Sequence, residues 1–272
     1  MTPRHLPLEL QREIFEIAVR SNHKNAALKL NLSLVASHVH LWSVVDRIFY
    51  ESVSIIGFTG AIKFLDLINL KPPGFLATTV KTLLLHFIPA DDCVRILSAC
   101  SGVQSLAVWN ARMQTTLFPQ ISQLSLRRLC MSFVPVTDIL AAATIPAWLS
   151  NITHLDIHCL DAPNFAIFGR LPNLTHVTLP LNEAVPLIAN AVCASCPTLQ
   201  IVVIVCGKLP ATAVIDSYSF DLRIVVAVFP SDDVGDWEAS HFGLPDMWTS
   251  AERVVAKRKK ALATLRSIDN SA

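Results

Sequence analysis

Glycine and charge are both scarce in this chain of 272 residues. It contains only eight glycines, and neither GxxxxGK[ST] nor GxGxxG occurs, which argues against phosphate-binding loops. Charged residues make up 16%, against about 25% in typical domains, and the formal net charge is +1. No overall field therefore attracts nucleic acid or anionic lipid. GxSxG and HExxH are also absent, so we expect no enzyme, no cofactor and no bound metal.

Apolar residues, by contrast, make up 52% of the sequence, enough to bury a large core. The seven cysteines are Cys93, Cys100, Cys130, Cys159, Cys193, Cys196 and Cys206. Their odd number and the lack of an apolar leader predict buried, reduced thiols in the cytoplasm or the nucleus. Cys193 and Cys196 form a lone CxxC, which we interpret as two small buried side chains because zinc needs four ligands.

One uncharged run, Ala184 to Gly207, has the length of a membrane span. Pro197 stands near its middle and would leave backbone groups unpaired in lipid. We therefore predict a buried helix, a turn and a buried strand here, and no membrane partner.

A six-residue pattern recurs between residues 57 and 230: apolar, polar, any, apolar, any, apolar. Its seven copies begin at Val80, Val103, Ile121, Ile152, Leu174, Leu199 and Leu222, between 18 and 31 residues apart. The pattern matches the strand core of leucine-rich repeats, whose period is about 20–29 residues. It predicts an irregular repeat array of α/β type, with these strands side by side in one parallel sheet and return helices between them.

Side chains at alternate positions of these strands should point away from the core, because the side-chain period of a strand is two. We expect an outward face for substrate binding, formed by Trp109, Arg127, His154, Asp156, His158 and His176. Its histidines and Asp156 are compatible with a metal or acid–base cluster, but we favour a polar surface that contacts a partner, since no nucleophile or oxyanion hole accompanies them.

The segment 231–272 is expected to cap the array. Thr249 and Glu252 fit a capping box at the start of an amphipathic helix, and Lys257–Lys260 fit its solvated face better than a nuclear-import signal. The outward positions of the last two strands are apolar: Ile201, Val203, Val205, Ile224, Val226 and Val228. We predict that Trp237, Phe242, Trp248 or the following helix covers them and leaves the middle strands open.

The spacing of apolar residues in the first 56 positions predicts short amphipathic helices. One apolar stripe consists of Leu10, Ile14 and Ile17. Such a small unit cannot bury all its apolar faces alone, so it needs a partner or the following region. Its apolar residues are either a docking surface or the core of a small helical cap.

The motifs Leu6-Pro7-Leu8-Glu9-Leu10, Ile14-Phe15, Leu32-Ser33-Leu34-Val35, Trp42 and Phe49-Tyr50 resemble an F-box of the kind common in fungal F-box-like proteins. With the repeats that follow, the chain is similar to F-box proteins with leucine-rich repeats. The resemblance implies an α+β fold: a helical F-box-like domain at 1–56, a repeat solenoid at 57–230, and a C-terminal cap at 231–272.

The resemblance also implies a function. F-box helices dock on the adaptor subunit of cullin–RING ubiquitin ligases, and the repeats capture a protein substrate without catalysing a reaction. The docking residues it implies are Leu6, Pro7, Glu9, Leu10, Ile14, Phe15, Leu34, Val35 and Trp42. The alternative is a repeat-type protein-binding scaffold whose degenerate F-box does not dock.

Overall fold

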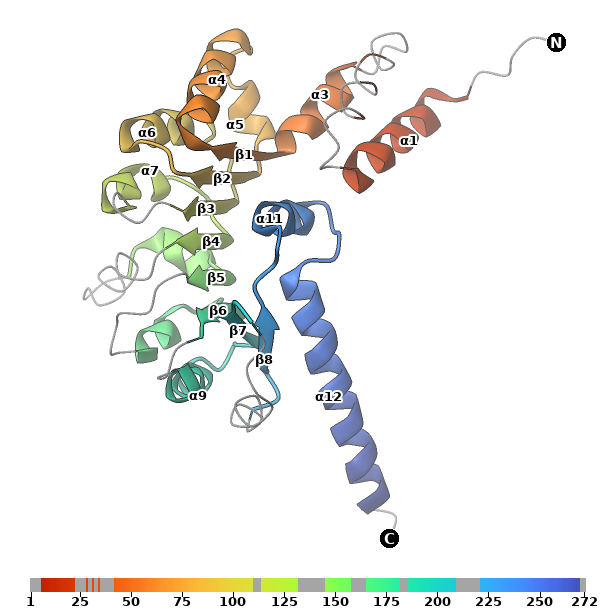
Figure 1. Cartoon of the computed structure of the whole chain (residues 1–272), viewed down its shortest axis with the longest axis vertical. Helices are drawn as coiled ribbons and strands as arrows, with labels where there is room; N and C mark the ends of the chain where they lie inside the picture. The colour runs from red at the N-terminus through yellow and green to blue at the C-terminus, as the bar shows by residue number, and fades with distance from the viewer. Residues whose placement is uncertain are drawn as a thin grey trace, which may run out of the picture.

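The computed structural model describes residues 6–22, 28, 31, 34, 42–109, 114–131, 145–157, 165–181, 185–208 and 221–269. Its centre is an open, eight-stranded parallel sheet in which the strands pair in chain order (Figure 1). The strands are β1 (Ser52–Ile56), β2 (Thr82–His86), β3 (Ser105–Trp109), β4 (Arg128–Met131), β5 (His154–Ile157), β6 (His176–Pro180), β7 (Ile201–Cys206) and β8 (Ile224–Val228). The expectation of a mixed helix and sheet fold with one parallel sheet is confirmed.

Helices lie on both sides of this sheet (Figure 1). The outer side carries α4 (Gly57–Leu70), α5 (Phe75–Thr79), α6 (Ala90–Ala99), η1 (Gln114–Leu117), α7 (Phe118–Ile121), η2 (Ala147–Asn151), η3 (Phe165–Arg170) and α9 (Val185–Ser195). The inner side carries α11 (Asp233–His241) and α12 (Met247–Asp269), while α1 (Leu8–Ser21) and α3 (Trp42–Glu51) extend from the β1 end. Parallel pairing requires such crossover connections, because a tight turn cannot join parallel strands.

The register of the sheet aligns one apolar side chain from every strand. This column consists of Val53, Leu83, Leu106, Leu129, Leu155, Val177, Val202 and Ile224. All except the half-buried Val53 are at most 2% exposed, and they belong to the core between the sheet and the outer helices. Burying one such side chain contributes about 1.5–3 kcal/mol, so the shared register is the main stabilising feature of the sheet.

The predicted strand beginning at Ile121 is wrong. Ile121 ends helix α7, and the fourth strand begins at Arg128. Leu129 pairs with Leu106, which places Leu126 in line with Val103. The segment from Leu126, LRRLCM, carries the same six-residue pattern as the segment from Ile121, and its distance of 23 residues from Val103 equals that between Val80 and Val103.

The register of the last strand also differs from the prediction by one residue. Ile224 pairs with Val202 and therefore faces the main core, and Val226 also packs against that core. Val225 and Ala227 point outward instead of the predicted Ile224, Val226 and Val228. The sheet gains a further strand at its other end, because β1 adds in parallel beside β2. β1 directly follows α3, within the range assigned to the N-terminal domain.

The uncharged run from Ala184 forms α9, a turn and β7, as predicted. No helix within the described ranges combines the length and the apolar composition that crossing a bilayer demands.

A glycine at the turn between α6 and β3 allows a close backbone approach. A Cβ atom on Gly102 would lie 2.0 Å from the carbonyl oxygen of Ala77, whereas a Cβ on Gly207 would meet no atom within 4 Å. Only a shift of the backbone can relieve the first contact, because a carbonyl group cannot rotate away as a long side chain does.

We expect Gly102→Ala to lower the free energy of unfolding by about 1–3 kcal/mol, the usual cost of overpacking. Gly207→Ala is the matched control and should leave it nearly unchanged. Urea unfolding followed by circular dichroism measures both. Equal stability of the two variants would contradict the close packing of this turn.

Candidate binding surface

The inner face of the sheet changes character along the strand order. One column of side chains on this face is Ser54, Leu84, Ala107, Cys130, Asp156, Thr178, Val203 and Val225. The column is apolar on β2 to β4, polar on β5 and β6, and apolar again on β7 and β8. Polar groups therefore gather near the middle of the face, between two apolar areas.

Helix α12 covers the apolar area on β7 and β8. Its side chains Trp248, Ala251 and Val255 are each at most 4% exposed. They form one buried cluster with Ile201, Val203, Val205 and Val225. The prediction that the C-terminal segment covers the last two strands is confirmed, although through Val225 rather than through the three residues expected on β8.

The start of α12 also differs from the expectation. Asp246 is its N-terminal capping residue and accepts hydrogen bonds from the backbone N–H and the hydroxyl of Thr249. Thr249 thus lies inside the helix rather than at its cap, and an aspartate in this position satisfies an N–H group that the helix leaves unpaired.

Helix α11 extends the cover to the other end of the sheet. Trp237 is buried in a cluster with Leu84, Ala107 and Cys130. Glu238 accepts a hydrogen bond of 2.7 Å from the hydroxyl of Ser54 on β1. The expectation that the C-terminal segment leaves the middle strands open is therefore wrong, because α11 and α12 together lie across the sheet from β1 to β8.

Two histidines of the expected substrate face lie beneath α12. The rings of His154 and His176 stack with centroids 4.1 Å apart, and the Trp248 ring stands edge-on to both. Nε2 of His176 is 3.3 Å from a carboxylate oxygen of Glu252. Burial lowers the pKa of His154 to about 3, and the neighbouring His176 and the positive charge of Arg128 act in the same direction. Burial also lowers the pKa of His176, so the stacked pair is neutral at physiological pH.

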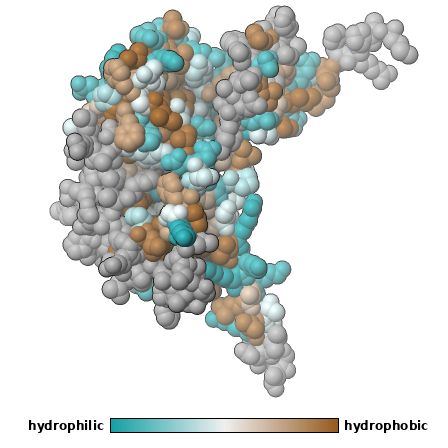
Figure 2. Space-filling view, viewed as in Figure 1, coloured by the Kyte–Doolittle hydropathy of each residue, from teal (hydrophilic) through white to brown (hydrophobic). Residues whose placement is uncertain are grey.

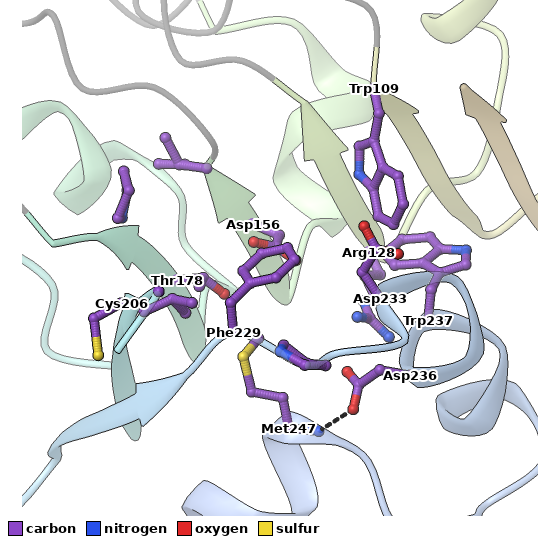
Figure 3. Close-up of a pocket in the computed structure, with 15 residues that line it drawn as sticks. Trp109, Arg128, Asp156, Thr178, Cys206, Phe229, Asp233, Asp236, Trp237 and Met247 are labelled. Atoms are coloured by element: carbon purple, nitrogen blue, oxygen red, sulfur yellow. Dashed lines mark hydrogen bonds between the residues drawn. The ribbon is translucent and has the colours of Figure 1, made fainter. Parts of the chain in front are cut away.

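A cavity of about 350 Å³ lies between the polar middle of the face and the segment that leads into α11 and α12 (Figure 3). Aromatic rings of Trp109, Phe229 and Trp237 line it, together with Arg128, Asp156 and Asp236. Its volume is at the lower end of the range found for small-molecule sites.

Arg128 is the buried cation of this cavity. Its side chain is 6% exposed, and its guanidinium carbon lies 3.9 Å from the ring centroid of Trp237. Its Nε atom has no hydrogen-bond partner in the described ranges of the chain. Burial lowers the pKa of Arg128, while the negative charges of Asp156 and Asp246 act in the opposite direction.

Three carboxylates line the same cavity: Asp156, Asp233 and Asp236. Asp236 accepts a hydrogen bond of 3.0 Å from the backbone N–H of Met247, which connects the ends of α11 and α12. Burial and the negative charge of Asp246 raise its pKa to about 6, although Arg128 opposes the shift. The pKa of Asp236 stays raised although Arg128 is near, so the guanidinium compensates the negative charge of this carboxylate only in part.

The structure brings together only part of the expected substrate face. Trp109 and Asp156 line the cavity, and His154 and His176 lie under Trp248. Arg127 is exposed at the start of β4, beside Thr153 and Thr175 and away from the cavity. His158 lies outside the described residues. Arg128 occupies the inner-face position that was predicted for Arg127 from the strand beginning at Ile121.

Most of the expected docking residues lie on or beside α1. Leu6, Pro7, Glu9, Leu10 and Ile14 are exposed, and so is Leu34. Phe15 is half-buried. Pro7 directly precedes the helix, and its carbonyl oxygen accepts the hydrogen bond of 3.0 Å from the N–H of Gln11. Trp42 begins α3, and Val35 lies outside the described residues.

Among the residues of the cavity that were not part of the expected site are Arg128, Phe229, Asp236 and Trp237. The constant spacing of 23 residues from Val80 to Val103 to Leu126 was the available signal for Arg128. No repeat pattern includes the other three, which reach the cavity only because α11 folds back over the sheet.

The six cysteines that the structure describes are buried. Burial raises the pKa of Cys93 to about 11 and that of Cys100 and Cys193 to about 12. These groups are therefore poor nucleophiles and poor metal ligands at neutral pH. Across the described ranges, no cluster of three or more His, Cys, Asp or Glu side chains is arranged to hold a metal ion.

No protein-family model matches this chain, and the curated proteins include no significant match to its sequence.

The neutral state of His154 predicts a pH-dependent stability. The pKa of His154 is lower in the folded protein than in the unfolded chain. Its contribution to the free energy of unfolding is therefore complete above the usual histidine pKa, and this contribution is lost as the pH falls below that value. We expect the wild type to lose about 2 kcal/mol of unfolding free energy between pH 7 and pH 4.5 relative to His154→Gln, after allowance for partial exposure. Urea unfolding of both proteins at the two pH values measures this difference. The same pH dependence in both would show that the ring is accessible to protons without unfolding.

Proposed function

We propose that this chain is a non-catalytic substrate-recognition subunit of a cullin–RING ubiquitin ligase. In this role α1 and α3 dock on the adaptor subunit, and the cavity between the inner face of the sheet and the segment that leads into α11 and α12 binds a protein substrate in the cytoplasm or the nucleus. The observation that carries the proposal is the row of exposed apolar side chains on α1, in the segment that resembles an F-box.

Helix α1 has two apolar faces, and only one of them is buried by the part of the chain that the structure describes. Val19 is 1% exposed, and this side of α1 packs toward α3. Leu10, Ile14 and Ile17 follow one another at helical spacing on a different side, and they are 46%, 53% and 58% exposed. Figure 2 shows apolar residues on the surface of this helix. A row of large apolar side chains on a surface marks an interaction site, since water contact with it is unfavourable.

The connection between the helices and the sheet suits a protein that holds a substrate in a fixed position. Helix α3 continues directly into β1. Nζ of Lys71 lies 2.7 Å from a carboxylate oxygen of Asp46 on α3, and both side chains are largely buried. The Lys71 ammonium also lies 4.5 Å from the ring centroid of Tyr50. These contacts support a rigid link between the docking segment and the substrate-binding face.

The sheet supports the second half of the proposal. Strands in one shared register, of which β1 to β7 are each preceded by a helix or a 3-10 turn, fit an irregular leucine-rich-repeat-like solenoid. We assign α11 and α12 as its C-terminal cap. The buried thiols and neutral histidines supply no activated nucleophile, which agrees with a role in binding rather than catalysis.

Copurification with the adaptor tests the proposal. We expect the wild-type chain to form a complex with the adaptor at micromolar concentration. Leu10→Glu combined with Ile14→Glu should weaken it at least tenfold, because two charges would be buried at the interface. Both positions are exposed, so the urea midpoint of the variant should stay near that of the wild type.

Leu265→Glu is the matched control, since Leu265 is 60% exposed on α12 at the opposite end of the molecule. This variant should keep full adaptor binding. A folded wild-type chain that shows no association with the adaptor would instead favour the alternative, a repeat-type scaffold that does not dock.

A further inference from the structure

The cavity on the inner face carries more negative than positive charge. Its lining includes three carboxylates, from Asp156, Asp233 and Asp236, and one cation, Arg128. Asp246 lies close enough to raise the pKa of Asp236 further. Among the described residues, no ion pair joins Arg128 to any of these carboxylates. The guanidinium therefore compensates the carboxylates only partly.

Some polar atoms around this cavity lack a hydrogen-bond partner among the residues that the structure describes. Thr178 is 3% exposed and lines the cavity, and its hydroxyl oxygen is buried without a hydrogen bond. Nε of Arg128 is in the same state. A buried polar atom without a partner costs about 1–3 kcal/mol. The hydroxyl oxygen of Thr178 can accept a hydrogen bond from an occupant that brings an N–H donor, whereas Nε–H of Arg128 is itself a donor and gives no preference for such an occupant.

We propose that this cavity takes a single lysine or arginine side chain of the captured protein. The inference rests on the proposed function, because it assigns the class of segment that the substrate-binding face recognises: an exposed basic one. The cation lies among the carboxylates of Asp156 and Asp236, and its alkyl stem lies between the aromatic walls.

Aromatic rings support a cation rather than an anion. The rings of Trp109 and Phe229 also line the cavity: Trp109 packs against the cluster that contains Trp237, whose ring Arg128 occupies, and Phe229 is exposed. Their negative faces attract an ammonium or guanidinium group, by about 0.5–2 kcal/mol. An anion could contact Arg128 but would also meet three carboxylates, whose repulsion in a site of low dielectric outweighs one favourable contact.

The cavity is accessible to a side chain from outside. Phe229 is 40% exposed and belongs to the short connection between β8 and α11, so this wall faces solvent. Figure 3 shows Asp156, Asp236 and Phe229 around the same space. A long, flexible side chain fits such an opening better than a bulky ring system would.

Three blocked peptides test the inference on the full chain labelled with ¹⁵N: acetyl-Gly-Arg-Gly-amide, the same peptide with citrulline, and the same peptide with glutamate. Citrulline has nearly the shape of arginine without its charge. We expect saturable shifts of the indole N–H signals of Trp109 and Trp237 with the arginine peptide. Their assignment comes from Trp109→Phe and Trp237→Phe. The signal of Trp148, which packs against the main core on the other side of the sheet, should not move.

The citrulline peptide should bind at least tenfold more weakly, and the glutamate peptide should cause no shift. Equal binding of arginine and citrulline peptides, tighter binding of the glutamate peptide, or no shift with any of them at about 10 mM would each overturn the inference.

Asp156→Asn should weaken arginine binding at least fivefold. Asp66→Asn removes an exposed carboxylate on α4 and should leave binding unchanged. If Asp156→Asn fails to fold, the peptide series on the wild type still decides. If the chain binds the arginine peptide but not the adaptor, the proposed ligase function is wrong and the basic-side-chain site stands. If it binds the adaptor but not the arginine peptide, the site is wrong and the proposed ligase function stands.

Discussion

One constraint organises this molecule: every strand must place an apolar side chain at the same level of a single stack. The column from Val53 to Ile224 satisfies it eight times. A shift of one residue in a strand would exchange its two faces. In β5 and β6 it would move Leu155 and Val177 outward and bring Asp156 and Thr178 into the core. The outer helices differ in length and type, from the 14 residues of α4 to short 3-10 turns, because they need only return the chain to the next level.

The periodic part of the fold could be predicted from the sequence, and the exceptions have physical causes. The segments at Val80, Val103, Ile152, Leu174 and Leu199 lead into strands because their alternating pattern agrees with burial on one face. At Ile121 the same pattern occurs twice within a few residues, and only pairing with Leu106 selects the later copy. At the last strand a nearly unbroken apolar run gives no alternation, so the register depends on its neighbour β7.

The candidate site could be predicted only in part, because half of it comes from outside the repeats. Asp156 and Trp109 stand at outward positions of strands, which alternation identifies. Trp237 and Asp236 reach the same cavity from α11, and no local pattern shows that this helix folds back across the sheet. The buried state of His154 follows from the same long-range contact, since a residue alternating toward solvent becomes enclosed once Trp248 lies above it.

The contacts between the two ends of the chain have a consequence for its synthesis. Glu238 bonds Ser54 and His241 lies 3.3 Å from Glu51, across sequence separations of 184 and 190 residues. During translation the inner face of β1 to β8 therefore remains bare until α11 and α12 have left the ribosome. The nascent protein exposes an apolar strand surface at Ile201 and Val203 throughout that interval, and long-range closures of this kind form slowly. A message truncated shortly before α11 would yield a sheet whose inner surface is open to aggregation, so chaperone protection is needed most until α11 and α12 have been synthesised.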